Sequence, residues 1–218
     1  MKNILVIGAN SFIAKEFVNR TGLAKTSNFL LASRSGETHI HLDFSDYTSI
    51  DNIAKLVYVG VDGILFFQGI NPQKNTKETD SEHVLKMMEV NILGPIMLIK
   101  SLANKLNANA SIIFFTSIAA KKGSYDPAYA AAKSAINGLL ISFANEFSNF
   151  RFNAISLGLV EGSPVFKGMT PDFIDKHRSK MYNNKLIKIT NVVSVIDELI
   201  SNDNLNKETI NLDGGFSL

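Results

Sequence analysis

Three residues whose side chains can hold or move a proton, Ser117, Tyr129 and Lys133, lie in the segment TSIAAKKGSYDPAYAAAK, residues 116–133. An aspartate–proline pair just before the tyrosine is typical of a helix cap followed by a first-turn proline, so we expect a helix to begin there. Tyr129 and Lys133 then lie one turn apart on one helix face, about 6 Å along the axis. Helical side chains lean toward the N-terminus, which brings the ammonium of Lys133 beside the phenol of Tyr129.

Such a pair can do acid–base chemistry if the lysine makes the tyrosine more acidic. A free phenol has a pKa of ~10 and transfers protons poorly at neutral pH. A neighbouring cation lowers that pKa, and reaching ~7 requires ~4 kcal/mol of differential stabilisation. We expect Lys133, helped by a second cation in a partly dry site, to lower the pKa of Tyr129 in this way. The spacing alone would favour an ordinary exposed helix face, and the neighbouring elements reverse that interpretation.

The elements that must position these residues have a pattern of their own. A buried-looking strand, SIIFFTS, residues 111–117, ends at Ser117, and the next helix carries Tyr129 and Lys133. This arrangement resembles the catalytic segment of the short-chain dehydrogenase/reductase family, in its small single-domain branch. The resemblance implies that Ser117 holds the substrate oxygen, that Tyr129 is the acid–base group and that Lys133 binds the nicotinamide ribose. The implied reaction is reversible hydride transfer between NAD(P)(H) and a carbonyl or secondary alcohol.

A fourth catalytic residue is implied by the same resemblance: Asn91, in the sequence VNILG at residues 90–94. Pro95 follows this stretch and has no N–H to bond the carbonyl four residues back, which is that of Asn91. In the family, the matching carbonyl holds a water that relays protons to the lysine. We therefore expect Pro95 to keep the Asn91 carbonyl open as an acceptor.

The beginning of the chain predicts a phosphate-binding turn. An apolar strand, Asn3–Ile7, ends at Gly8, and a helix follows over residues 11–21, so helix amides could meet a pyrophosphate. The family pattern of three glycines is kept only at Gly8, because Phe12 and Ala14 stand at the other two positions. The alternative interpretation is an ordinary strand–turn–helix. The cofactor contacts expected from this region are Gly8, Asn10, Ser11, Phe12 and Ile13.

The second strand, Asn28–Ser33, leads into Arg34, where such folds meet the adenosine ribose. No acidic residue stands there to bind a 2′-hydroxyl, whereas an arginine and the Ser33 hydroxyl suit a 2′-phosphate. NADP(H) is therefore favoured over NAD(H), the alternative for Arg34 being a surface arginine. A short strand over residues 38–42 precedes Asp43, which the resemblance assigns to the adenine, with Phe44 beside it.

His39 and His41 share a strand face with Asp43, a grouping that superficially suits a metal ion. Nothing else nearby completes a coordination shell, so we expect no metal.

The nicotinamide end of the cofactor is expected where the fourth and sixth strands end. The strand over residues 61–67 leads to Gln68 and Gly69, and the missing side chain of Gly69 leaves room for a ribose. After the strand Arg151–Leu157, the resemblance assigns Gly158 and Val160 to the nicotinamide. The last strand, Thr209–Leu212, precedes a family-like Asp-Gly-Gly ending.

Two helices, over residues 79–106 and 127–149, carry more apolar residues than one sheet face can cover. A helix that is apolar almost all round is buried on both sides. In the family, these helices pair with their copies in a second subunit, so we expect a homodimer or homotetramer. The alternative, a monomer with an extra covering segment, leaves few residues to build it.

Residues 160–188 are the expected substrate lid, with six basic residues between 167 and 188 against Asp172 and Asp175. A solvated helix face explains such charges by default. Recognition of an anionic substrate, such as a carboxylate, a nucleotide-linked sugar or an acyl carrier, is the alternative.

The whole chain, residues 1–218, is expected to be one α/β domain with a single doubly wound parallel sheet, a Rossmann-like three-layer sandwich. A net charge of +2 with no arginine-rich tract does not favour nucleic acid, and the chain has no cysteine. No apolar run reaches the ~18 residues of a spanning helix, and no secretory signal is evident, so we expect a cytoplasmic protein with no membrane partner.

The principal alternative function is a non-catalytic sensor or assembly module, built on a reductase scaffold that lost cofactor affinity through Phe12. Such a module would be expected to lose the catalytic residues as well. A sugar epimerase or dehydratase of the larger branch is disfavoured, because no substrate domain follows the predicted sheet.

Overall fold

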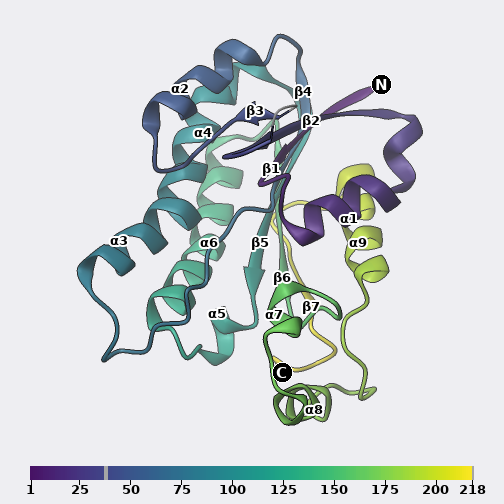
Figure 1. Cartoon of the computed structure of the whole chain (residues 1–218). Coiled ribbons are helices and arrows are strands. Elements are labelled where there is room, and N and C mark those ends of the chain that lie inside the picture. Colours follow the sequence, from purple (N-terminus) through teal and green to yellow (C-terminus); the bar gives the residue numbers. More distant parts are fainter. Residues whose placement is uncertain (37–38, 218) are drawn as a thin grey trace.

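Seven strands pair side by side into one parallel sheet in the computed structural model, which describes residues 1–36 and 39–217 (Figure 1). The spatial order is β3-β2-β1-β4-β5-β6-β7, so the strand order reverses between β1 and β4. In doubly wound sheets, the crevice at such a reversal, outside the carboxyl ends of the strands, holds the ligand. The strands are β1 (Lys2–Ile7), β2 (Ser27–Ser33), β3 (Ile40–His41), β4 (Val61–Phe66), β5 (Leu106–Ser117), β6 (Arg151–Leu157) and β7 (Thr209–Leu212).

Helices cover both faces of this sheet, which confirms the predicted three-layer sandwich (Figure 1). One face packs against α1 (Phe12–Arg20) and α9 (Ile189–Ser201). The other packs against α2 (Tyr47–Leu56), α4 (Gly94–Leu102) and α6 (Pro127–Glu146). The shorter helices are α3 (Ser81–Met88), α5 (Ala119–Lys122), α7 (Pro164–Lys167) and α8 (Pro171–Arg178), with 3₁₀ turns at Gly22–Lys25 and Ala103–Lys105.

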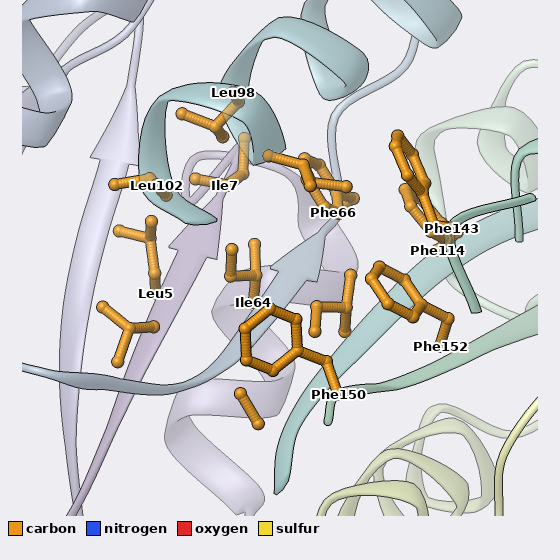
Figure 2. Packing of buried hydrophobic residues seen from close by; sticks show 14 of the residues in the cluster. Leu5, Ile7, Ile64, Phe66, Leu98, Leu102, Phe114, Phe143, Phe150 and Phe152 are labelled. Atoms are coloured by element: carbon orange, nitrogen blue, oxygen red, sulfur yellow. The ribbon is translucent and has the colours of Figure 1, made fainter. Parts of the chain in front are cut away.

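Phenylalanine pairs tie the central strands together on both faces. Phe66 stacks on Phe114 with 4.9 Å between ring centroids, on the side of α2, α4 and α6 (Figure 2). The following residues, Phe67 and Phe115, stack at 4.7 Å on the opposite face. Successive side chains of a strand point to opposite faces, so one pair of adjacent strands contributes to both cores. This rigid centre holds the ends of β4 and β5, from which the site is built.

The helix predicted over residues 79–106 is found over residues 81–102, but it is not a regular α-helix throughout. It consists of α3, a π turn at Glu89–Leu93 and α4; a short 3₁₀ turn follows, and residue 106 already begins β5. The Gly94 N–H donates to Glu89 O, five residues back, and Pro95 next to it has no N–H. The missing donor interrupts the α-helical ladder at this point, as proline does inside helices.

The other predicted bounds differ less. The helix expected to run to residue 149 ends at Glu146, because the chain turns after Phe147 and stacks that ring on Phe150 with 5.6 Å between centroids. Of the strand expected over residues 38–42, Ile40 and His41 are in β3, and residue 38 lies outside the described residues. Among the described residues, no helix is both long and apolar enough to cross a membrane.

Candidate active site

Helix α6 begins at the predicted cap and carries Tyr129 to the end of β5. The Asp126 side chain accepts from the Tyr129 N–H at 3.1 Å, and a proline occupies the first helical position, which confirms the predicted start. Thr116 Oγ1 donates to Lys133 O at 2.7 Å and so fastens this helix to the strand. Ser117, the last residue of β5, is hydrogen-bonded to the Tyr129 side chain.

The Lys133 side chain is buried beneath the tyrosine ring. Its Nζ donates to Phe115 O at 2.9 Å and lies 5.8 Å from the centre of the Tyr129 ring. Burial disfavours the charged amine and lowers the pKa of Lys133 from 10.5 to about 8. The lysine is therefore held in place by a backbone carbonyl, and its charge is costly in this position.

The expected effect of Lys133 on the acidity of Tyr129 is not found, and that prediction is wrong for the chain by itself. Burial raises the pKa of the Tyr129 phenol, and the hydrogen bond with Ser117 opposes this only in part. The Lys133 ammonium donates to the carbonyl of Phe115, and its charge is itself disfavoured by burial. Within the protein alone, the phenol is thus a proton donor rather than a phenolate at neutral pH.

Asn91 lies in the π turn, 2% exposed, and presents an unpaired oxygen to the site. Its Nδ2 donates to Met87 O at 3.0 Å, which fixes the orientation of the amide. Its Oδ1 is buried and has no hydrogen-bond partner among the described residues. A Cβ atom built on Gly69 would lie 3.3 Å from this oxygen and 3.4 Å from Lys133 Nζ. The absent side chain of Gly69 therefore leaves a small polar space between an acceptor and a donor, which suits a ribose hydroxyl.

A cavity of about 210 Å³ lies along the carboxyl ends of β1, β2 and β4. Gly8 shapes its floor: it has φ +72°, and a Cβ atom there would lie 2.7 Å from Gln68 N, so only glycine is accommodated. Nine of the residues predicted to bind the cofactor line this cavity: Gly8, Asn10, Ser11, Ser33, Arg34, Asp43, Phe44, Gln68 and Gly69. The structure thus brings together residues from four separate stretches of the chain.

Within this cavity, the two residues predicted to meet a 2′-phosphate differ in their freedom. The Ser33 hydroxyl is buried and already engaged, 2.7 Å from His39 Nδ1 and 3.3 Å from Asn10 Nδ2. Arg34 is exposed at the cavity wall. Ser35 and Lys86 also line the cavity and were not predicted. Lys86 reaches it from α3, a position that no local sequence pattern indicates.

Phe12 does not line the cavity. Its ring is partly buried against the apolar cluster on the α1 and α9 side, together with Ile13. A Cβ atom built on Gly162 would lie 4.0 Å from the tip of the Phe12 ring, so the ring extends toward the segment after β6. Ala14, at the other replaced glycine position, is fully buried between helix and sheet.

The remaining predicted cofactor residues, Gly158 and Val160, lie at the end of β6, outside this cavity. The Gly158 N–H donates to Leu212 O at 3.0 Å, and a Cβ atom there would lie 3.0 Å from Asp213 Cα. Val160 is buried and forms a parallel bridge with Ile187. Gly158 therefore holds the segment after β6 against the end of β7, and Val160 holds it against the residues that precede α9.

A second cavity, of about 410 Å³, lies between the segment after β4 and the two short helices after β6. Gln73 forms one wall with a positive φ of 62°, a conformation that few residues other than glycine adopt. Sequence patterns gave no indication of Gln73. The opposite wall is mostly apolar and consists of Pro164, Val165, Gly168, Met169, Thr170 and Phe173.

Comparisons with known proteins match this arrangement over nearly the whole chain. A family model described as enoyl-(acyl carrier protein) reductase matches residues 17–217. A short-chain dehydrogenase/reductase from Brucella melitensis, described as a glucose/ribitol dehydrogenase, is 22% identical with a TM-score of 0.89, covering 100% of this chain and 97% of that one. A small-chain dehydrogenase in complex with NADPH is 22% identical with a TM-score of 0.85, covering 99% and 98% of the two chains. A 4-hydroxyisoleucine dehydrogenase mutant complexed with NADH and succinate is 21% identical with a TM-score of 0.89, covering 99% and 98%.

The structural likeness at these identities shows the fold, and the family model covers far more than half of the chain. Both agree with the parallel sheet and its flanking helices described above. The chain therefore belongs to the short-chain dehydrogenase/reductase family, nicotinamide-dependent oxidoreductases that act on CH–OH and C=O groups.

Proposed function

We propose that this protein is an NADP(H)-dependent reductase of a carbonyl compound that carries an anionic group, acting reversibly. The observation that carries the proposal is the meeting of Lys133 Nζ and Asn91 Oδ1 beside Gly69, with Tyr129 and Ser117 adjacent. Gly69, beside which these groups meet, lines a cavity suited to a nucleotide, and Gln73, four residues later, lines a second cavity large enough for a substrate.

Each residue would act on a stated atom. The Ser117 hydroxyl would hold the substrate oxygen, and the Tyr129 phenol, kept protonated by burial, would donate its proton to that oxygen during reduction. Lys133 and Asn91 would hold ribose hydroxyls in the space beside Gly69, and the Asn91 carbonyl would hold a water for proton return. A bound nicotinamide nucleotide supplies the hydride.

The preference for NADP(H) is proposed from Arg34, because its exposed guanidinium lines the nucleotide cavity and could pair with a 2′-phosphate. Replacing it by Arg34→Ala should weaken NADPH binding about 10- to 100-fold, as expected for a charged hydrogen bond, and leave NADH binding nearly unchanged. Fluorescence titration of both nucleotides measures this, with Arg20→Ala on the outer part of α1 as the control. Equal loss for both nucleotides would contradict the assignment.

The anionic substrate is proposed from the lid, residues 160–188. The second cavity has both polar and apolar walls, and Val165, Met169 and Phe173 in its lining suit an acyl or alkyl chain. Of the lid cations, Arg178 is paired with Asp175 at 2.7 Å, and Lys180 Nζ lies 5.1 Å from the centre of the Phe216 ring. The remaining lid lysines could bind a carboxylate or a phosphate. An acyl chain on a carrier is one such substrate class. A carboxylated carbonyl substrate should be reduced faster than its methyl ester. This difference in rate should become smaller at high salt, which screens exposed charges.

The deciding experiment follows NADPH oxidation with a panel of carbonyl compounds, anionic ones first. The Tyr129→Phe variant should lose about 10²- to 10⁴-fold in kcat, the usual contribution of a positioned acid, while its affinity for NADPH stays near that of the unmodified protein. Equal turnover by this variant would contradict the role of the phenol. Failure of the unmodified protein to bind millimolar NADPH would instead favour the non-catalytic module.

A further inference from the structure

A buried, hydrogen-bonded histidine–aspartate pair lies next to the proposed catalytic residues and has no part in the roles given above. His83 on α3 and Asp126 at the start of α6 meet with 2.9 Å between Nε2 and Oδ2. Their side chains are 3% and 0% exposed, and 43 residues of chain separate them. Burying charged groups is expensive unless they are paired and fully hydrogen-bonded, so such a pair needs a reason.

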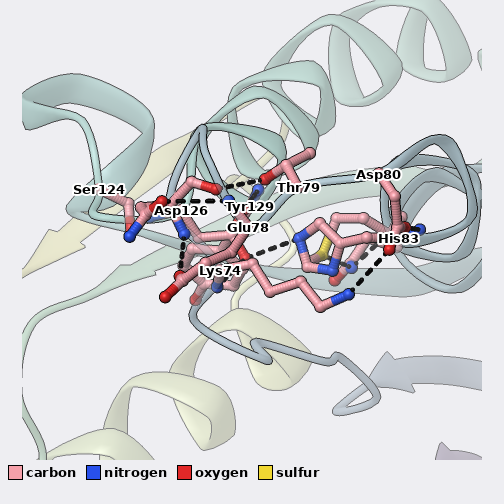
Figure 3. Close-up of polar contacts among 11 residues, drawn as sticks. Lys74, Glu78, Thr79, Asp80, His83, Ser124, Asp126 and Tyr129 are labelled. Atoms are coloured by element: carbon pink, nitrogen blue, oxygen red, sulfur yellow. Dashed lines mark hydrogen bonds and ion pairs between the residues drawn. The ribbon is translucent and has the colours of Figure 1, made fainter.

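The Asp126 carboxylate joins three parts of the molecule (Figure 3). Oδ1 accepts from the N–H of Tyr129 at 3.1 Å, and Oδ2 accepts from the N–H of Lys74 at 3.3 Å as well as from His83. Burial acts to raise the pKa of Asp126, but these hydrogen bonds outweigh it and the pKa is lowered. The carboxylate is thus ionised, which makes Nε2 of His83 the donor.

His83 is in turn fixed from its own helix. The Asp80 side chain caps α3 by accepting from the His83 N–H at 2.7 Å, and it also accepts from Lys74 Nζ at 3.2 Å (Figure 3). Met87, one turn after His83, packs with Ala128 and Ala132 of α6. These contacts hold α3 against α6, where the buried His83 side chain meets Asp126.

Each bond of this network ends at a part of the site. Tyr129 is held through its own backbone amide. Lys74 directly follows Gln73, which forms a wall of the 410 Å³ cavity with a strained backbone. Helix α3 continues into the π turn that carries Asn91. The pair thus fixes the tyrosine and the cavity wall relative to one another.

We propose that His83 and Asp126 are positioning residues, which set the Tyr129 phenol at the correct distance from a carbonyl bound against Gln73. This inference rests on the proposed reductase function. It requires that breaking the pair lowers kcat and raises KM for the carbonyl substrate. Binding of NADPH should be spared, because none of His83, Asp126 and Lys74 lines the nucleotide cavity.

Two substitutions of His83 separate positioning from simple loss of packing. His83→Leu removes the donor, whereas the amide nitrogen of His83→Gln can take the place of Nε2. We expect His83→Leu to lower kcat/KM for the carbonyl about 10- to 100-fold, the scale of an ångström-sized misplacement, and His83→Gln to restore most of it. NADPH affinity should be the same in both variants.

A second variant keeps the test decisive if His83→Leu does not fold. Asp126→Ser retains an effective helix cap for the Tyr129 N–H but removes the acceptor for His83 and Lys74. We expect it to behave like His83→Leu. The matched control is Ile196→Ala, a fully buried position on the opposite face of the sheet, which should lower the melting temperature while leaving kcat/KM unchanged.

Amide hydrogen exchange provides a measurement that does not depend on turnover. Exchange in the first turn of α6 should be faster in His83→Leu than in His83→Gln. The inference is overturned if His83→Leu or Asp126→Ser keeps full kcat/KM, if the Leu and Gln variants lose it equally, or if exchange at Tyr129 is the same in both. A lack of turnover by the unmodified protein with every carbonyl would instead contradict the proposed function. The hydrogen-exchange comparison would still test the positioning role.

Discussion

At the scale of single residues, the site combines a phenol that burial keeps protonated with an amine that burial tends to discharge. The pKa of Tyr129 is raised and that of Lys133 is lowered to about 8, both chiefly by removal from water. Burial thus favours the neutral form of both groups, so release of the Tyr129 proton has to be coupled to its uptake by the substrate oxygen. A purely structural lysine would more simply be replaced by an apolar residue, because its burial costs stability.

The burial of Lys133 makes folding stability depend on pH. Its pKa is lower in the folded than in the unfolded chain, so the unfolded chain binds more protons between pH 8 and 10.5. The resulting penalty is fully present below pH 8 and is relieved as pH rises through this window. Relative to Lys133→Met, the free energy of unfolding of the unmodified protein should rise by about 2 kcal/mol from pH 7 to pH 9.5.

Urea unfolding of both proteins at several pH values measures this difference. The bond from Lys133 to Phe115 O is lost in the methionine variant at every pH and only offsets the two curves. Measurements stay below pH 10, because above it the pH dependence of stability also includes Tyr129, whose pKa is higher in the folded than in the unfolded chain. Parallel curves for the two proteins would show that the amine is not destabilised by burial.

At the scale of elements, the π turn between α3 and α4 presents Asn91 to the site. Gly94 ends this turn, and it must be glycine because a Cβ atom there would lie 2.3 Å from Cγ of Phe44. Phe44 in turn lines the nucleotide cavity. The π turn therefore carries the buried oxygen of Asn91 and also packs, through Gly94, against the Phe44 ring that lines the nucleotide cavity. Such turns are often found at functional sites.

Restoring the missing donor of this turn tests its role. Pro95→Ala supplies an N–H that can bond the Asn91 carbonyl and return the segment to a regular α-helix. We predict a more protected amide at residue 95, unchanged or higher melting temperature, and a loss of kcat up to about 100-fold from the interrupted proton return. Hydrogen exchange and steady-state kinetics measure these quantities. A protected amide together with full kcat would show that the Asn91 carbonyl need not be open.

Local patterns account for most of the elements and for the residues that act within one of them. The cap of α6, the spacing of Tyr129 and Lys133, and the positions of the strands follow from neighbouring residues. The direction of Lys133 Nζ, the engagement of Ser33 with His39 and the pairing of His83 with Asp126 do not. These contacts depend on how separate elements pack against one another. A small difference in that packing decides, for example, whether Lys133 Nζ bonds a phenol or a backbone carbonyl.

At the scale of the whole molecule, the helices beside the sheet leave apolar side chains uncovered. The inner side of α4 is buried against the sheet, with Leu98, Ile99 and Leu102 at most 1% exposed. On the outside, Leu85 of α3 is 69% exposed and Ile141 of α6 is 53% exposed. The pattern agrees with the sequence-based expectation that one side covers the sheet and the other needs a partner. We propose that a second copy of this chain packs against α3 and α6.

Charge on this outer surface should separate the copies. A lysine at an apolar interface stays solvated only if the interface opens, so Leu85→Lys combined with Ile141→Lys should convert a dimer or tetramer to a monomer. Sedimentation velocity across a range of concentrations measures the change, and Tyr58→Lys, at an 86% exposed position between α2 and β4, is the control. The double variant should also lose activity if the partner steadies α6, because Tyr129 and Ile141 belong to the same helix. A monomeric unmodified protein at micromolar concentration would exclude this assembly, and a double variant that remains oligomeric would place the contact elsewhere.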